Sequence, residues 1–173
     1  EQIKQVFWEK DRYKICSFSG EKGFENPAIW SYYTNILRWV AIEFSIEDEK
    51  IKNNIEKVRY NNKIKKLKKS LSENDIKYIL TKKFTARKNE DEYRFIKQQD
   101  NDKCKIKKIN AVYFWKPYHN INNYEDIIDN NSKLQADIKE YEKLKKRIIK
   151  ILKNKKIPYF DIYIQNGKVK KIV

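Results

Sequence analysis

The positive charge of this chain is concentrated in three segments, and this distribution is what most limits how the chain can fold. Residues 50–71 contain nine basic residues and one acidic residue, 103–120 contain five and none, and 132–156 contain ten and three. These segments carry a formal +20 within a chain of +16, so the remaining residues sum to −4. Because lysine and arginine are almost never fully buried, each segment has to keep a face in solvent. Positive charge gathered in this way is typical of a polyanion-binding surface.

The base composition of the genome offers a second explanation for the lysines. Only six of the 40 basic residues are arginine, and Asn, Ile and Tyr, which share AT-rich codons with lysine, are also abundant. A codon bias would enrich lysine along the whole chain, whereas residues 1–49 carry a net charge of −3. Since lysine is a point charge and lacks the planar fork of arginine, the composition favours recognition of backbone and shape over reading of bases.

Length and composition predict a single compact domain over residues 1–173. Apolar residues make up 40% of the chain and aromatic residues 14%, which is too much for a disordered basic tail. Three glycines and three prolines leave little material for a flexible linker. The chain starts at Glu1 and contains no methionine, which indicates a trimmed chain, a processed product or an excised domain.

Neither a run of 18 apolar residues nor a secretory leader is visible, which predicts an intracellular, cytoplasmic protein without a membrane partner. Cys16 and Cys104 are far apart and belong to no CxxC or Cys/His cluster. A domain with this much core material does not need a disulfide, so we expect two reduced, packed thiols.

Hydrophobic periodicity and turn residues predict an α+β fold whose mostly antiparallel sheet is built from hairpins. A central helical group is expected, together with one long helix in the C-terminal half that opens at a capping box, Ser132 to Gln135. The expected helices are 27–44, 46–60, a further segment to 71 beyond a break at Asn61-Asn62, 72–84 and 132–156. The expected strands are 2–8, 13–18, 93–98, 104–109, 111–115, 160–165 and 168–173.

Three turns are expected to join strands into hairpins. Asn166-Gly167 is the strongest signal, because both residues tolerate the positive φ angles of a type I′ turn. The polar stretch 99–102 would join 93–98 to 104–109, and residues 9–12 would join the first two strands.

Two weak candidates for catalysis occur. His119 follows a strand end, where an imidazole can act as a general acid or base, but the sequence places no serine, cysteine or carboxylate beside it. Asp91, Glu92 and Arg94 approach the acidic pattern of metal-dependent nucleases, a pattern that arises freely when 37% of residues are charged. Walker and dinucleotide-binding loops are absent from the sequence, and we expect no cofactor and no metal site.

Lysines and aromatic rings are interleaved in residues 103–118. Exposed rings there would stack on unpaired bases, but Tyr113 and Trp115 are more readily explained as interior residues of a strand. The residues expected to contact nucleic acid come from the three basic segments. They are Lys63, Lys65, Lys66, Lys68, Lys69, Lys105, Lys107, Lys108, Lys116, Tyr118, Lys143, Lys146, Arg147 and Lys150.

These observations predict a non-enzymatic module that binds the phosphate backbone of nucleic acid through lysine-rich helices. RNA or a ribonucleoprotein is preferred over DNA, because arginine is scarce and no DNA-binding motif is identifiable. Two alternatives stay open: a small nuclease or RNase-type toxin, and a protein-interaction factor that binds an acidic protein surface.

If the basic segments bind phosphates, affinity for RNA or DNA should fall steeply as salt is added. Each neutralised phosphate contributes a slope of about 0.7–0.9 in the plot of log affinity against log salt concentration, because counterions are released. Fluorescence anisotropy with a labelled single-stranded RNA measures this slope. An affinity that does not change with salt concentration, or no binding at low ionic strength, would contradict the polyanion interpretation.

Overall fold

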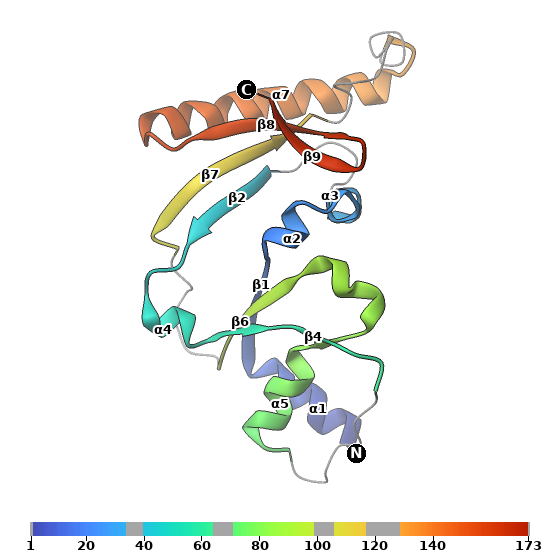
Figure 1. The fold of residues 1–173 in the computed structure, drawn as a ribbon, viewed down its shortest axis with the longest axis vertical. Coiled ribbons are helices and arrows are strands. Elements are labelled where there is room, and N and C mark those ends of the chain that lie inside the picture. Colours follow the sequence, from blue (N-terminus) through green and yellow to red (C-terminus); the bar gives the residue numbers. More distant parts are fainter. Residues whose placement is uncertain (1, 34–39, 64–70, 99–105, 117–128, 173) are drawn as a thin grey trace. The chain divides into compact units, whose positions relative to one another are not determined.

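The structure, a computed structural model, describes residues 2–33, 40–63, 71–98, 106–116 and 129–172 (Figure 1). Its mostly antiparallel sheets and one long helix confirm the predicted α+β class. The contacts divide the chain into two compact units: unit 1 is Glu1–Phe24 with Ile46–Lys105, and unit 2 is Glu25–Ser45 with Ile106–Val173. Neither unit is a continuous stretch of chain. The expectation of a single domain is not tested by this division and stays a prediction.

Unit 1 is built around a three-stranded antiparallel sheet in the order β1-β6-β3. A short parallel pair, β4-β5, forms a separate ladder. The strands are β1 (Tyr13–Ser19), β3 (Ile55–Lys57), β4 (Arg59–Tyr60), β5 (Lys82–Lys83) and β6 (Glu92–Gln98). The helices are α1 (Gln2–Asp11), α2 (Glu21–Phe24), α4 (Glu49–Lys52), α5 (Glu73–Leu80) and the 3-10 helix η1 (Thr85–Glu90).

The core of unit 1 forms where α5 packs on β6. Ile76 and Leu80 of the helix meet Ile96 of the strand, and all three are nearly inaccessible to solvent. The helix expected from residue 72 begins at a capping box: the hydroxyl of Ser72 accepts a hydrogen bond from the backbone N–H of Asp75, and the Asp75 carboxylate accepts from the N–H of Ser72. The helix ends at Leu80, four residues earlier than expected.

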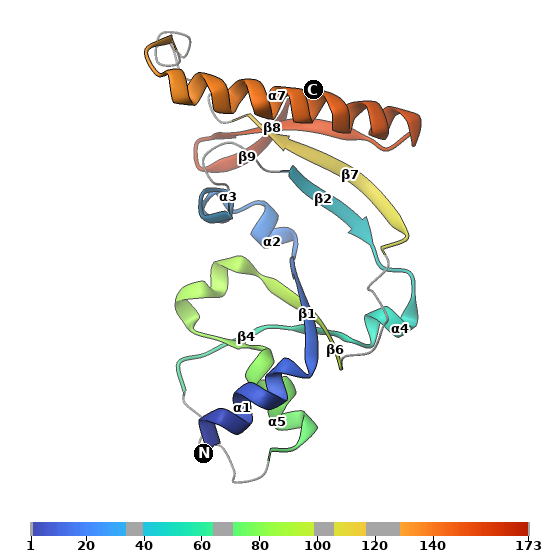
Figure 2. The same cartoon turned by 180° about the vertical axis from the view of Figure 1, so that it is seen from behind.

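Unit 2 is a four-stranded sheet in the order β2-β7-β8-β9, with the long helix α7 along one face (Figures 1 and 2). β7 and β8 are parallel, which requires a long crossover between them, and α7 lies in that connection. The elements are α3 (Pro27–Tyr33), β2 (Val40–Ser45), β7 (Lys108–Trp115), α7 (Ser132–Asn154), β8 (Tyr159–Gln165) and β9 (Lys168–Ile172).

The two faces of β7 carry different side chains, because successive residues of a strand point to opposite sides. Val112 and Phe114 face α7 and form a core with its Leu152. On the other face, Trp115 stacks on Trp30 of α3 with ring centroids 5.4 Å apart. Both faces of the strand are therefore buried, as the continuous apolar run 111–115 predicted.

The final hairpin is confirmed. β8 and β9 pair antiparallel around Asn166 and Gly167, whose φ angles of 51° and 69° are the two positive values that a type I′ turn requires.

Three expected elements are wrong. Residues 2–8 belong to the helix α1, which packs beside α5, and not to a strand. The helix predicted over 27–44 begins at Pro27, but its last part is the strand β2, which pairs with β7. Between residues 46 and 60 the structure has the one-turn helix α4 followed by β3 and β4. The apolar spacing in these short segments suits a helix as well as a strand. The available pairing partners therefore decide which of the two forms.

Two further expectations about pairing and burial are corrected. The hairpin between 93–98 and 104–109 does not form, because β6 pairs with β1 and β3 while β7 pairs with β2 and β8. Cys16 is exposed on β1 and not packed, and Cys104 lies outside the described residues. Among the described residues, no helix combines the length and apolarity needed to cross a membrane.

The long helix is confirmed, with changes at its start and along its apolar stripe. Asn131 is the N-cap in place of Ser132, and its side chain accepts a hydrogen bond from the N–H of Leu134. Leu144 and Ile151 of the helix are 46% and 54% exposed although both are apolar. The buried face is therefore narrower than the apolar residues of the sequence indicate.

Neighbouring residues of α7 give a matched test of this packing. Leu152→Ala should lower the free energy of unfolding by about 2–5 kcal/mol, because Leu152 is 5% exposed and its removal leaves a cavity against β7. Ile151→Ala should change it by no more than about 0.5 kcal/mol, as is usual for an exposed site. Urea titrations followed by circular dichroism compare the two, and equal losses would contradict the orientation of α7.

Candidate nucleic-acid interface

One face of α7 presents a row of four lysines, Lys139, Lys143, Lys146 and Lys150, here called the lysine face. All four are exposed. At 3.6 residues per turn they fall within about 60° of arc. The buried Tyr141 lies on the opposite side of the helix and donates a hydrogen bond to the carbonyl of Trp115. Packing of the apolar stripe on the sheet thus turns the lysine face to solvent.

No carboxylate of the described residues neutralises the lysine face. Within the part of the chain that the structure describes, none of its four ammonium groups has an ion-pair or hydrogen-bond partner. The acidic residues of the helix, Asp137, Glu140 and Glu142, lie outside its arc. The lysine face is therefore a row of positive charges open to a ligand.

Lys145 shows what a structural lysine looks like on the same helix. It points toward the sheet, where its ammonium group lies 2.7 Å from a carboxylate oxygen of Asp161 on β8 and 5.5 Å from the ring centre of Phe114. The basic residues at the end of the helix, Lys153 and Lys155, also have a structural explanation, because positive charge stabilises a helix C-terminus.

The structure brings together only some of the predicted contact residues. Lys143, Lys146, Arg147 and Lys150 lie on exposed positions of α7. Lys107, Lys108 and Lys116 are exposed around the two ends of β7, and Lys63 is exposed in unit 1. The remaining predicted contact residues lie outside the described residues, and they are Lys65, Lys66, Lys68, Lys69, Lys105 and Tyr118. The weak catalytic candidate His119 also lies outside them. Lys139 was missed, although its spacing from Lys143 and Lys146 is the helical signal that reveals it.

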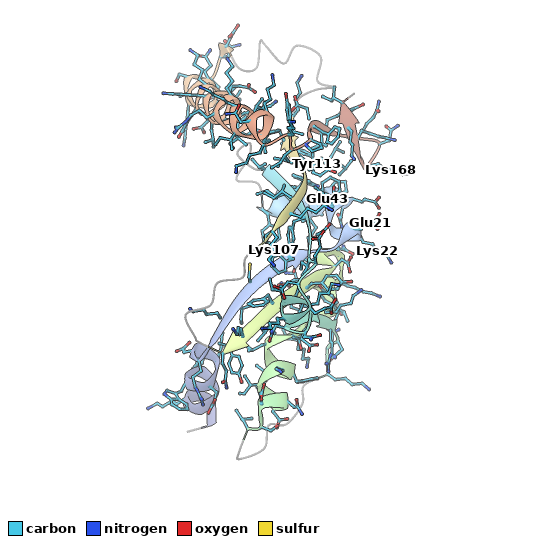
Figure 3. All side chains as sticks on the ribbon, turned by 90° about the vertical axis from the view of Figure 1, so that its left-hand side faces the viewer. Glu21, Lys22, Glu43, Lys107, Tyr113 and Lys168 are labelled. Atoms are coloured by element: carbon cyan, nitrogen blue, oxygen red, sulfur yellow. The ribbon has the colours of Figure 1, made fainter. Side chains whose placement is uncertain are left out.

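The aromatic rings of β7 are interior residues, as expected. Tyr113 and Trp115 are 4% and 8% exposed, so neither can stack on a base. The hydroxyl of Tyr113 donates to Glu43 on the neighbouring strand (Figure 3), and its ring stacks on Phe160. Burial, together with this carboxylate, raises the pKa of Tyr113 to about 12. Base stacking on this segment is therefore excluded for these two rings.

The acidic residues considered for a nuclease site are part of a buried ion-pair network. Lys83 bridges two buried carboxylates, at 2.5 Å from Glu90 and 2.6 Å from Glu92, and Glu92 also binds Arg94 at 2.8 Å. Asp91 has a left-handed backbone with φ 42° and lies 3.4 Å from Lys57. No group of three or more residues able to hold a metal ion occurs in the described ranges. These carboxylates are thus already neutralised by cations.

Hydrogen bonds have a larger effect than burial on the pKa of Glu92. Burial alone would raise its pKa, but hydrogen bonds from Arg94, Lys83 and Ser17 hold the pKa below its usual value. The sequence pattern identified Glu92 and Arg94 but not Lys83 or Glu90. The network consequently stabilises unit 1 most when Glu92 is ionised.

Comparisons with protein-family models, with curated proteins and with solved structures found no match for this chain.

Replacing Glu92 by Gln should destabilise the protein by on the order of 2–3 kcal/mol at neutral pH, because Lys83 and Arg94 lose a charged partner in a buried site. The folded pKa of Glu92 is lowered, so its stabilisation is complete above the ordinary glutamate pKa of about 4.3 and is lost as the pH falls through the folded value. The difference in free energy of unfolding between wild type and E92Q should therefore become smaller below about pH 4.

Glu73→Gln is the matched control, because Glu73 pairs with Lys77 on the surface of α5. An exposed pair of this kind contributes about 0.3–0.5 kcal/mol. Urea unfolding between pH 3 and 7 measures both variants, and a loss for E92Q that does not depend on pH would contradict the role of its charge.

Proposed function

We propose that this protein is a non-enzymatic nucleic-acid-binding module that contacts a phosphate backbone through α7. The observation that carries the proposal is the lysine face: four exposed ammonium groups on one side of a helix, without carboxylate partners among the described residues. Such a surface attracts polyanions by electrostatics and by the release of their counterions.

The dimensions of the lysine face suit a nucleic-acid strand. Lys139 and Lys150 are eleven residues apart, which corresponds to about 17 Å along a helix. One strand of a duplex presents about five phosphates over this length. Because the helix is held against the sheet by its opposite face, the lysines are positioned together and not on a flexible tail.

RNA or a ribonucleoprotein is the favoured partner, with contacts to backbone and shape. Lysine offers a point charge that suits phosphate but does not make the bidentate contacts with which arginine reads guanine. Burial of Tyr113 and Trp115 also supports backbone contact over base stacking in unit 2. An acidic protein surface would meet the same lysines, and direct binding to purified RNA separates that alternative.

The experiment replaces Lys143, Lys146 and Lys150 together by Glu, and in a second variant by Gln, which removes charge without adding repulsion. If three phosphate contacts are lost, the slope of log affinity against log salt should fall by about 2–3, equally for unrelated RNA sequences. Fluorescence anisotropy over a series of salt concentrations measures it, with circular dichroism to confirm that the helix is intact.

The control changes Lys4, Lys22 and Lys88 to Glu, which alters net charge by the same amount at exposed positions outside the basic segments. RNA binding should then change far less than in the α7 variants. Equal losses in both triple variants would show that net charge alone drives binding. RNA cleavage that requires Mg²⁺ and is lost in His119→Ala would instead support the nuclease alternative.

A further inference from the structure

The outer strand of the unit 2 sheet, β9, carries a second group of exposed lysines, Lys168, Lys170 and Lys171. Lys171 turns to the face of the sheet that holds Tyr113 and Phe160, where its ammonium group lies 5.0 Å and 4.9 Å from the two ring centres. Among the described residues, the ammonium groups of Lys168 and Lys170 have no ion-pair or hydrogen-bond partner. These two lysines, here called the β9 pair, are therefore open to a ligand.

The β9 pair lies on the face of the sheet that α7 covers. Asp161 of β8 reaches Lys145 of α7, so its side chain marks this face. Ile172 is the register partner of Asp161, and residues directly opposite one another in a ladder share a face. Because side chains alternate along a strand, Lys170 and Lys168 point to the same side as Ile172. The β9 pair and α7 consequently lie on one side of the sheet, α7 over it and β9 at its edge (Figures 1 and 2).

Along the helix axis, the β9 pair lies beside the N-terminal half of α7. Tyr141 of the helix donates a hydrogen bond to the carbonyl of Trp115, and Trp115 is the register partner of Ile162 on β8. Lys170 pairs with the next residue of β8. Lys170 is therefore close to the level of Tyr141, where the first half of the lysine face lies on the far side of the helix.

The lysine face and the β9 pair form two rows of positive charge separated by the body of the helix. β9 lies two positions from β7, the strand on which α7 packs, and this corresponds to about 10 Å across the sheet. The helix with its side chains is about 10–12 Å thick, and the lysine face is on its side away from the sheet. The two rows are therefore on the order of 15 Å apart.

The flank of α7 between the two rows does not favour a phosphate. Lys145 and Glu142 are three residues apart and so share this flank. The charge of Lys145 is already compensated by Asp161, and Glu142 is exposed without an ion-pair partner in the described part of the chain. A polyanion that meets both rows should thus place its phosphates at the rows themselves and leave a gap over Glu142.

We propose that unit 2 binds an RNA duplex, with phosphates of one strand on the lysine face and phosphates of the other strand on the β9 pair. A duplex carries two rows of phosphates with a groove between them, and the wide, shallow minor groove of A-form RNA leaves both rows accessible from one side. A single strand carries one row only. The inference rests on the proposed function, since it names the form of RNA that the surface of α7 binds.

The test compares an annealed RNA duplex of about 16 base pairs, which is longer than α7, with a single strand of about six nucleotides, which covers the lysine face alone. Fluorescence anisotropy over a series of salt concentrations measures both ligands with the full chain. Changing Lys168 and Lys170 together to Gln should lower the slope of log affinity against log salt by about 2 for the duplex, because two phosphate contacts are lost. The same variant should bind the single strand like the wild type.

The matched control changes Lys171 and Lys88 together to Gln, which removes the same amount of charge. Lys171 is on the same strand but faces the other side of the sheet, and Lys88 is exposed in unit 1. The slope for the duplex should then change by less than about 0.5. Circular dichroism checks that both double variants are folded, and Lys22 with Lys88 gives a second control outside the sheet. Equal losses of slope in the variant and its controls would overturn the role of the β9 pair.

The two proposals fail separately. If neither RNA binds at low ionic strength, the proposed function is wrong. If both RNAs bind and the triple variant of Lys143, Lys146 and Lys150 weakens both, but the slope for the duplex is unchanged in the variant of the β9 pair, the duplex inference is wrong and the role of α7 stands.

Discussion

The packing of α7 on β7 is the constraint on which the architecture of unit 2 and its candidate surface depend. Phe114 of the strand is fully buried and forms a core with Leu152 of the helix. Because the helix lies in the crossover from β7 to β8, the same packing permits these strands to be parallel. It also fixes which lysines meet the sheet and which meet solvent. The lysine face is thus a consequence of hydrophobic burial on the opposite side of the helix.

The protein places its lysines in two electrostatic environments. In unit 1, Lys83 lies between the buried carboxylates Glu90 and Glu92. A buried charge is costly unless an opposite charge pairs with it, so these three groups stabilise one another. On α7, Lys145 has such a partner in Asp161, whereas the four ammonium groups of the lysine face have no carboxylate partner among the described residues. A surplus of positive charge raises self-repulsion, and an anionic ligand would reduce it. This difference in partners, more than the number of lysines, distinguishes structural lysines from candidate contact residues.

Local signals predicted the elements whose structure is decided locally. The helix start at residue 72, the Asn166-Gly167 turn and the long amphipathic helix depend on residues a few positions apart, and all three are confirmed in outline. The prediction of a helix over residues 40–45 was wrong because their apolar spacing suits a helix as well as a strand. Pairing with β7 decides in favour of the strand. The proximity of Arg59 and Lys82 was missed for a similar reason, since these residues become neighbours through β4-β5 pairing.

The sequence by itself determined the α+β class, the buried run 111–115 and the basic character of the segment that forms α7. These properties follow from composition and from the periodicities of strands (two residues) and helices (3.6 residues). Both can be read without knowing which distant segment packs opposite. Only the tertiary structure decided that Glu92 is neutralised by Lys83 and that Leu144 and Ile151 stay exposed. Each of these depends on which strand or helix packs opposite, and residues far apart in the chain supply that contact.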